Sequence, residues 1–453
     1  MDSLVHDPEK NRALTQYHAK RNRCFAGWLW SQRFFMTPPF SPELLVPAGD
    51  MEKFRTAVLY GADAVYLGGT SGNLRAASKG FTPAELRDAV SLAAVKNVKI
   101  YYCLNALPFE RDMAAMPEAV ETAAEAGVHA FIVADPGVLS LVQRYAEGVP
   151  AHISTQANTT NAGAVRFWTD AGASRVVLAR ELPHREIRAI RAQLPETELE
   201  VFVHGAMCLA VSGQCLLSAW LNNRPANLGR CTQPCRFEYR ATDAAFSLTL
   251  EEALRPGQAL WDIQQNENFA ALFAPDDLCL LPFLPWFIKN RINALKIEGR
   301  TKGAAYVAHV TDAYRAALDA AAASLASGTA FPFRSFLPDL ARTASRPLST
   351  GFFLHKRRAV TGVAAPRPLL AKILEPLNSD NTAWAVTVLG KWDEARPAEI
   401  MLPGMRRPVM APGTYALENH RGERAGSAAS GTRAVLYTDV PGVVPGVFIR
   451  EIV

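Results

Sequence analysis

Four cysteines stand close together in the middle of the chain and form its most distinctive chemical feature. Thiolates are soft ligands that bind iron-sulfur clusters or zinc, and four of them complete either set. Structural zinc sites usually carry paired C-x2-C motifs, whereas the spacing here is C-x6-C-x15-C-x3-C. The pattern therefore favours a 4Fe-4S cluster, with zinc or unligated structural thiols as alternatives. The four predicted ligands are Cys208, Cys215, Cys231 and Cys235.

Three further cysteines lie outside this group. Cys279 lies near the predicted eighth strand and is an alternative fourth ligand. Cys24 and Cys103 are interpreted as bystanders, Cys103 because it lies within a strand that we expect to be buried, where free cysteine is common. Seven cysteines in 453 residues are an odd number and do not resemble a secreted disulfide framework. We therefore expect a reducing, cytoplasmic location.

A repeating pattern of a short β-branched run, a turn and a longer segment with helical spacing starts at residue 43. This pattern is typical of parallel βα units. Eight such units predict a closed, TIM-like (β/α)8 barrel, although an open doubly wound sheet would produce a similar string. The expected strands are 44–46, 64–67, 99–104, 130–133, 151–154, 175–178, 200–203 and 294–297.

The predicted α/β barrel occupies residues 41–330, with a Cys-rich insertion between strands seven and eight over 204–290. A connection of that length is normally functional. A linker containing Pro and Arg is expected over 331–360. Short alternating runs separated by Gly, Pro and Asn then predict a small all-β, barrel-like domain over 361–453.

Residues 1–40 form a basic N-terminal extension that mixes Lys and Arg with Phe and Trp. They lack the apolar core and cleavage site of a secretory signal. We interpret them as a disordered basic arm or as sequence that precedes a true start at Met36. The net charge of +5 permits an anionic partner such as RNA without requiring one. Apolar runs stop well short of the roughly 20 residues that a membrane span needs, so no span is expected.

Active sites of TIM barrels lie at the C-terminal ends of the strands, so polar residues that follow the predicted strands are candidates. The catalytic candidates are His204, Glu298 and Arg300. His204 could donate a hydrogen bond to a substrate or to a cluster sulfur, and Arg300 could bind an anion. A satisfied core histidine and a structural Glu-Arg ion pair explain these residues equally well.

Further polar residues at strand ends are candidates for substrate binding. Gln156 and Asn158 alternate along the chain that leaves the fifth strand, and Glu181 follows the sixth. Asn105 and Asp135 stand at the corresponding places after the third and fourth strands. Ordinary loop polarity explains these residues almost as well.

The cysteine-bearing stretch resembles the signature of peptidase family U32. Residues 200–218 read E-V-F-V-H-G-A-M-C-L-A-V-S-G-Q-C-L-L-S, with the family's G-A-x-C and G-x-C elements. The resemblance covers roughly residues 43–325 and is specific. Similar family patterns occur at 43–49 (E-L-L-V-P-A-G), 60–66 (Y-G-A-D-A-V-Y), 227–236 (N-L-G-R-C-T-Q-P-C-R) and 295–302 (L-K-I-E-G-R-T-K).

The resemblance implies a range of activities. The family was named for collagenase-like proteases, but several members are oxygen-independent hydroxylases that modify tRNA uridine, rRNA cytidine or ubiquinone precursors and carry iron-sulfur clusters. The branch that hydroxylates tRNA looks most similar, since it shares E-A-x-R-P-G at residues 252–257. The resemblance thus implies prephenate-dependent formation of 5-hydroxyuridine in tRNA, with prephenate as the small carboxylate co-substrate.

Three hypotheses follow. In a hydroxylase, the four cysteines hold the cluster, strand-end residues bind the carboxylate donor, and Arg236 or the β domain engages RNA phosphates. A peptidase is the alternative that the family name implies, but the chain has no H-E-x-x-H and no G-x-S-x-G motif. The third hypothesis is an accessory role beside a related protein subunit.

Overall fold

The computed structural model divides the chain into two units, Met1–Phe40 and Ser41–Val453. Predictions for residues 1–39, including Cys24, lie outside the described residues. The structure describes residues 40–70, 72, 80–208, 210, 215, 217–222, 224, 231–232, 234–236, 249–251, 259–262, 264–265, 270–271, 276–419 and 421–452.

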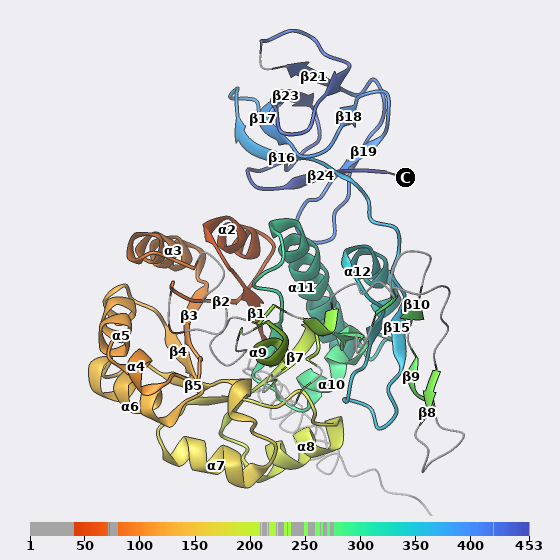
Figure 1. The fold of residues 1–453 in the computed structure, drawn as a ribbon. Helices are drawn as coiled ribbons and strands as arrows, with labels where there is room; N and C mark the ends of the chain where they lie inside the picture. The colour runs from red at the N-terminus through yellow and green to blue at the C-terminus, as the bar shows by residue number, and fades with distance from the viewer. Residues whose placement is uncertain are drawn as a thin grey trace, which may run out of the picture. The chain divides into compact units, whose positions relative to one another are not determined.

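Eight parallel strands close into a barrel, which confirms the predicted TIM-like fold (Figure 1). Strands β1 to β7 pair in chain order, and β13 pairs with both β7 and β1 to complete the ring. The barrel strands are β1 Glu43–Pro47, β2 Ala64–Leu67, β3 Lys99–Leu104, β4 Ala130–Val133, β5 Ala151–Ile153, β6 Arg175–Val177, β7 Glu198–Gly205 and β13 Ala294–Ile297.

Alternate residues of the strands point to opposite sides of the barrel wall and form two cores. Leu45, Tyr66 and Tyr101 belong to a cluster made only of strand residues, which fills the interior. Their neighbours Leu44 and Val65 belong to the larger cluster that includes the surrounding helices. Because both faces are buried, the strands appear in the sequence as nearly continuous apolar runs.

Helices surround the barrel (Figure 1). Local signals fix their ends: α3 begins where Thr82 and Glu85 form a capping box and ends at Asn97, which adopts the left-handed conformation. No helix in the described part of the chain has both the length and the apolar character of a membrane span. The helices are α2 Met51–Leu59, α3 Pro83–Lys96, α4 Glu110–Met113, α5 Met116–Glu125, α6 Pro136–Tyr145, α7 Ala162–Asp170, α8 His184–Gln193, α10 Leu284–Lys289 and α11 Ala304–Ser327.

The insertion begins at the end of β7 and returns on a strand that pairs with β7. This returning strand, β12 (Asp277–Cys279), runs antiparallel to β7 and places Cys279 opposite His204 and Leu278 opposite Gly205. A short helix, η5 (Leu281–Phe283), then leads into α10. The other described elements of the insertion are α9 Leu217–Asn222, η4 Pro234–Arg236, β8 Thr249–Glu251, β9 Ala259–Asp262, β10 Gln264–Gln265 and β11 Ala270–Ala271.

The segment 331–360, predicted as a linker, contains regular structure. Strand β14 pairs with β12, and β15 pairs with β14, so the segment extends the barrel sheet. Leu340, Leu348 and Phe353 are buried. The linker prediction rested on the Pro and Arg content of the segment and overlooked these apolar residues. The elements are η6 Phe333–Ser335, α12 Leu337–Thr343, β14 Leu348–Ser349 and β15 Ala359–Thr361.

The C-terminal region is antiparallel and all-β, as predicted. Its main sheet has the order β20-β19-β24-β16-β17-β23-β21, and the pairing found among described residues does not close this sheet into a ring. A second pair joins β18 to β22. The strands are β16 Leu369–Pro376, β17 Ala383–Val388, β18 Trp392–Asp393, β19 Ala398–Ile400, β20 Val409–Met410, β21 Tyr415–Asn419, β22 Ser427–Ala428, β23 Arg433–Thr438 and β24 Phe448–Glu451.

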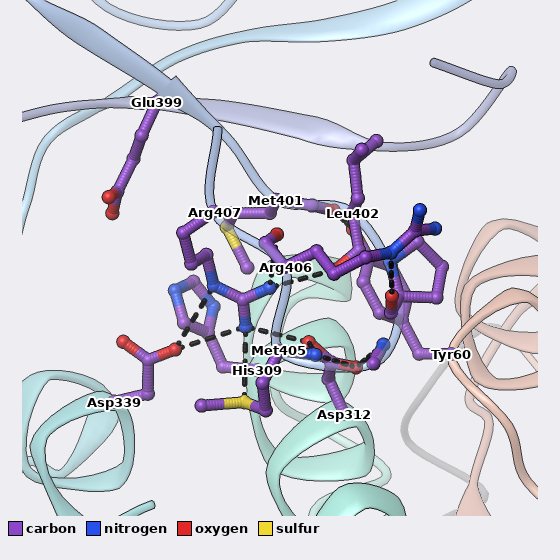
Figure 2. A network of polar contacts seen from close by, with 12 residues as sticks. Tyr60, His309, Asp312, Asp339, Glu399, Met401, Leu402, Met405, Arg406 and Arg407 are labelled. Carbon is purple, nitrogen blue, oxygen red and sulfur yellow. Dashed lines mark hydrogen bonds and ion pairs between the residues drawn. The ribbon is translucent and has the colours of Figure 1, made fainter. Parts of the chain in front are cut away.

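A buried polar network joins this sheet to helices α11 and α12 (Figure 2). Asp312 of α11 accepts hydrogen bonds from the backbone N–H of Gly404 at 2.6 Å and of Met405 at 3.2 Å. The Arg407 guanidinium lies between two carboxylates, 2.6 Å from Asp312 and 3.0 Å from Asp339. Each buried charge in the network therefore has a partner, as burial requires.

Candidate active site

A pocket of about 120 Å³ lies at the C-terminal ends of the barrel strands, where TIM barrels place their active sites. Strand ends and the cysteine insertion both contribute to its wall. The candidates Gln156, Glu298 and Arg300 therefore share one pocket with three of the predicted cysteine ligands. The pocket is lined by Tyr66, Cys103, Asn105, Ser154, Thr155, Gln156, Arg180, Phe202, Cys208, Cys215, Cys231, Lys296, Glu298 and Arg300.

The pocket contains more positive than negative charge. Arg180 donates to the Glu298 carboxylate at 3.1 Å, and its guanidinium lies 4.1 Å from the ring centre of Phe202. Lys296, on the barrel wall below, donates to the buried Glu200 at 2.8 Å. Three cationic side chains thus line the pocket, while Glu298 is the only carboxylate among its described lining residues. Such a site suits an anionic ligand.

Three of the four clustered cysteines line this pocket. Cys208, Cys215 and Cys231 contribute to its wall, and Cys235 lies in η4, a few residues beyond Cys231. None of the described cysteines forms a disulfide. In the part of the chain that the structure describes, no three Cys, His, Asp or Glu side chains converge closely enough to hold a single metal ion.

Gly205 connects β7 to the cysteine loop, and no larger residue suits its position. Its φ is +106°, which L side chains rarely adopt. A Cβ atom there would lie 2.7 Å from the carbonyl oxygen of Glu298. The glycine that follows His204 in the sequence motif therefore allows the cysteine loop to pass close to the strand that carries Glu298.

The substrate-binding candidates are divided between the pocket and its surroundings. Gln156 lines the pocket from η1 (Thr155–Ala157), whereas Asn158 and Glu181 are absent from its lining. Asn158 has φ +55°, and its side-chain oxygen is buried without a hydrogen-bond partner among the described residues. Arg236 is the last residue of η4, and its side chain lies outside the described structure.

Asn105 and Asp135, the other strand-end residues, have different roles. Asn105 lines the pocket and donates to the Ser154 hydroxyl at 3.2 Å. Asp135 accepts from the backbone N–H groups of Gly137 and Val138, so it caps the N-terminus of α6. Asp135 therefore has a structural role.

His204 lies in the protein core. It is 3% exposed, packs edge-on against Tyr314, and is absent from the pocket lining. Burial, together with the positive charge of Lys302, lowers the pKa of His204 to about 3. The ring is therefore neutral at physiological pH, and its position favours the interpretation as a core histidine.

Cys279 and Cys103 are both buried, but only Cys103 lines the pocket. Burial raises the pKa of the Cys279 thiol to about 11, and the Tyr314 hydroxyl lies 3.7 Å from its sulfur. Burial also raises the pKa of Cys103, whose thiol forms a hydrogen bond with Arg300. Cys103 was interpreted as a bystander, yet its strand brings it to the floor of the pocket.

Sequence reasoning missed Arg180 and Glu200. Arg180 follows β6 immediately before the candidate Glu181, but the chain leaving the strand turns Arg180 into the pocket. The position after a strand indicated this part of the chain, but it did not show whether Arg180 or Glu181 would line the pocket. Glu200 lies inside β7, where no sequence signal separates a buried carboxylate from an exposed one.

A sequence profile of peptidase family U32 matches residues 49–361. The chain belongs to peptidase family U32. This membership confirms the resemblance of the cysteine motif and of the barrel strands.

The chain is similar to several curated U32 relatives. The tRNA hydroxylation protein P of Escherichia coli is 35% identical, with 69% of this chain and 74% of that protein aligned. The tRNA hydroxylation protein P1 of Bacillus subtilis is 38% identical over 69% of this chain and 71% of its own length. A protein named collagenase from Porphyromonas gingivalis is 34% identical, with 61% of this chain and 66% of that protein aligned.

Proposed function

We propose that this U32 protein hydroxylates RNA, forming 5-hydroxyuridine in tRNA with prephenate as co-substrate. The observation that carries the proposal is that cysteines of the insertion line the same pocket as Arg180, Lys296 and Arg300. Two relatives named tRNA hydroxylation proteins support the choice of substrate.

We propose a 4Fe-4S cluster as the cofactor, held by the four clustered cysteines. Around such a cluster each thiolate binds a different iron atom, so the thiolates stand farther apart than around one zinc ion. Cys208, Cys215 and Cys231 share one wall of the pocket, and their spacing lacks the paired C-x2-C motifs of structural zinc sites. When bound, the cluster supplies one-electron redox chemistry. The predicted ligands are Cys208, Cys215, Cys231 and Cys235.

The cationic side chains bind and orient the co-substrate. Prephenate carries two carboxylates, and a planar guanidinium can pair with a carboxylate through two parallel hydrogen bonds. Arg180 is held by Glu298, while its Nε atom has no hydrogen-bond partner among the described residues. Asn105 and Gln156 add neutral polar groups to the same wall. Arg180 is therefore the side chain that we expect to bind a carboxylate of the co-substrate.

Anaerobic purification followed by visible absorption spectroscopy and iron and sulfide analysis tests the cofactor. We expect a brown protein whose absorption and iron content are lost in Cys208→Ala and Cys231→Ala. Cys279→Ala is the matched control, because this thiol is buried outside the pocket and should leave the cluster in place. A protein containing zinc, or loss of iron only in Cys279→Ala, would contradict the assignment.

Mass spectrometry of nucleosides tests the substrate. A bacterial strain that lacks its own tRNA hydroxylation proteins should regain 5-hydroxyuridine in tRNA when it expresses this chain, and should not regain it with Cys231→Ala. Hydroxylation that appears in rRNA or in quinone precursors instead would reassign the substrate. In that case the proposed 4Fe-4S cofactor and the hydroxylation reaction would stand, and only the substrate would change.

A peptidase is the second candidate, because one relative is named collagenase. Ser218, a serine of the family motif, is fully buried, and its hydroxyl accepts from the Thr232 backbone N–H at 3.0 Å. Nucleophilic serines require a base within hydrogen-bond reach. The side chain that hydrogen-bonds the Ser218 hydroxyl is the Thr232 hydroxyl, which is not a base. Hydrolysis of gelatin by the pure protein, abolished in Ser218→Ala, would favour the peptidase.

A further inference from the structure

A second and larger cavity lies beside α12 and β15, and we call it the basic groove. Its volume of about 1220 Å³ exceeds the roughly 300–1,000 Å³ that is typical of small-molecule sites. Four cationic side chains and one histidine line it, and its described lining contains no Asp or Glu. These residues are Arg334, Arg342, His355, Lys356 and Arg358.

The cations of the basic groove lack acidic partners. None of the five side chains forms an ion pair within the part of the chain that the structure describes. Elsewhere in the fold, the half-buried Arg407 is paired with Asp312 at 2.6 Å. Arg357, which does not line the groove, lies 3.5 Å from Asp276. The positive charge of the groove is therefore available to a ligand from outside the chain.

An intermediate cavity of about 360 Å³ lies between the basic groove and the cysteine pocket and shares lining residues with each. Leu354 and His355 line both the groove and the intermediate cavity. Cys208 lines both the intermediate cavity and the pocket at the strand ends. The shared residues place the three cavities next to one another, in order from the cations to the predicted cluster.

Aromatic side chains accompany the cations along these cavities. Phe283 and Phe333 line the basic groove. Phe352 lines the intermediate cavity, and its side chain is 55% exposed. Cationic grooves with exposed aromatic rings are typical of proteins that bind single-stranded nucleic acid, because phosphates pair with the cations and bases stack on the rings.

We propose that the basic groove binds a single-stranded stretch of the RNA substrate and that residues 349–358 guide the target nucleotide towards the cysteine pocket. Phe352 provides the stacking surface at the last step of this route. The inference rests on the proposed function, since it takes the substrate to be RNA. The complementary charge of the phosphate backbone is the reason for choosing RNA as the occupant.

The first test measures how salt weakens the binding of a labelled tRNA anticodon stem-loop, followed by fluorescence anisotropy. The variant Arg342→Gln/Arg358→Gln should bind at least about tenfold more weakly at low salt, and the slope of log Kd against log salt should fall by about 0.7 to 0.9 for each arginine removed. The control Arg87→Gln/Arg144→Gln removes two exposed arginines from α3 and α6, which do not line the groove, and should bind like the wild type.

The second test replaces Phe352 with Ala, which leaves the charge unchanged. Loss of base stacking should weaken RNA binding at least about fivefold without altering the salt slope. Phe167→Ala is the matched control, because Phe167 is also exposed, at 62%, but lies on α7 outside the three cavities. Unchanged thermal unfolding of both variants would show that the effect belongs to binding.

The outcomes separate this inference from the proposed function. Variants of the groove and of Phe352 that bind the stem-loop like the wild type would overturn the inference, even if tRNA is hydroxylated. Groove-dependent binding without any hydroxylated nucleoside would support the groove and overturn the proposed function. Poly-glutamate serves as a probe for an acidic protein partner. If the protein binds poly-glutamate but not the stem-loop, the partner is an acidic protein and the inference is wrong.

Discussion

At the scale of single residues, the charge balance of the pocket depends on pairs that lie at different depths. Lys296 is paired with Glu200 inside the barrel, so its charge is largely neutralised. Arg180 is paired with Glu298 at the level of the cysteines and is partly exposed, as is Glu298. Arg180 is therefore positioned to exchange part of its contact with Glu298 for a carboxylate of a ligand.

Replacement of Arg180 by Met should therefore impair the reaction without removing the cofactor. We expect 5-hydroxyuridine formation to fall by about tenfold or more, because loss of a charged partner that positions the substrate costs on the order of 1.5 to 3 kcal/mol. Iron content should not change. Arg188→Met on the exposed face of α8 is the control. Equal activity of the two variants would show that Arg180 does not bind the co-substrate.

At the scale of elements, helix α11 connects the barrel to the C-terminal sheet. Its Asp312 holds the loop before β20 through Gly404, Met405 and Arg407 (Figure 2). His309, one turn earlier, accepts at Nε2 from Arg450 of β24 at 2.8 Å, because an arginine can only donate. Its Nδ1 then donates to the Ala305 carbonyl at 2.7 Å. One face of α11 thus fixes both the loop and the sheet.

The variant Asp312→Asn should destabilise the protein by about 3 kcal/mol, since it leaves the buried Arg407 with one carboxylate partner and weakens the loop contacts. Asp319→Asn on the same helix removes an exposed partner of Arg315 and should change stability by less than about 1 kcal/mol. Urea unfolding of the two variants measures the difference. Similar urea midpoints for the two variants would mean that the Asp312 contacts contribute no more to stability than a surface ion pair does.

At the scale of the whole molecule, stability should decrease in mild acid. Burial, with Arg450 as the next cause, lowers the pKa of His309 to about 4, and burial lowers that of His204 to about 3. Both values lie below the ordinary histidine pKa of 6.5, so the unfolded chain binds more protons between these limits. The stabilisation is complete above about pH 6.5 and is lost as the pH falls below it.

Urea unfolding at pH 7.5 and pH 5 measures this effect. Each of the two histidines should contribute about 2 kcal/mol of lost stability at pH 5. The variant His309→Gln should be less stable at pH 7.5, but its stability should fall by about 2 kcal/mol less between the two pH values. If wild type and variant show the same pH dependence, His309 is not the source.

A separate loss should follow at lower pH. Burial opposes the charge of Asp339, but Arg450 and Arg407 outweigh it and lower the pKa of this carboxyl to about 2. Its stabilisation is present above about pH 4 and is lost as the pH falls towards 2. Unfolding of Asp339→Asn should therefore show a smaller decrease between pH 4 and pH 2 than the wild type.

Much of this organisation could be predicted from the sequence, because buried parallel strands produce apolar runs and the clustered cysteines have a recognisable spacing. The barrel and the shared location of Cys208 and Arg300 follow from those signals. The environment of His204 could not be predicted, since a strand-end histidine faces either the core or the pocket depending on local twist. The cation-rich wall formed by Arg342 and Arg358 was also not predicted. The Pro and Arg content of residues 331–360 is typical of a linker, and only the folded positions of α12 and β15 bring these arginines into one wall.

The pairing of β12 with β7 has a consequence for how this family can diversify. Gly205 lies opposite Leu278, so the two ends of the insertion are held together by strand hydrogen bonds. The entropy of closing a loop grows slowly with its length, by about 0.6 kcal/mol for each doubling. Segments between these ends can therefore be lengthened, shortened or exchanged with little penalty to the barrel.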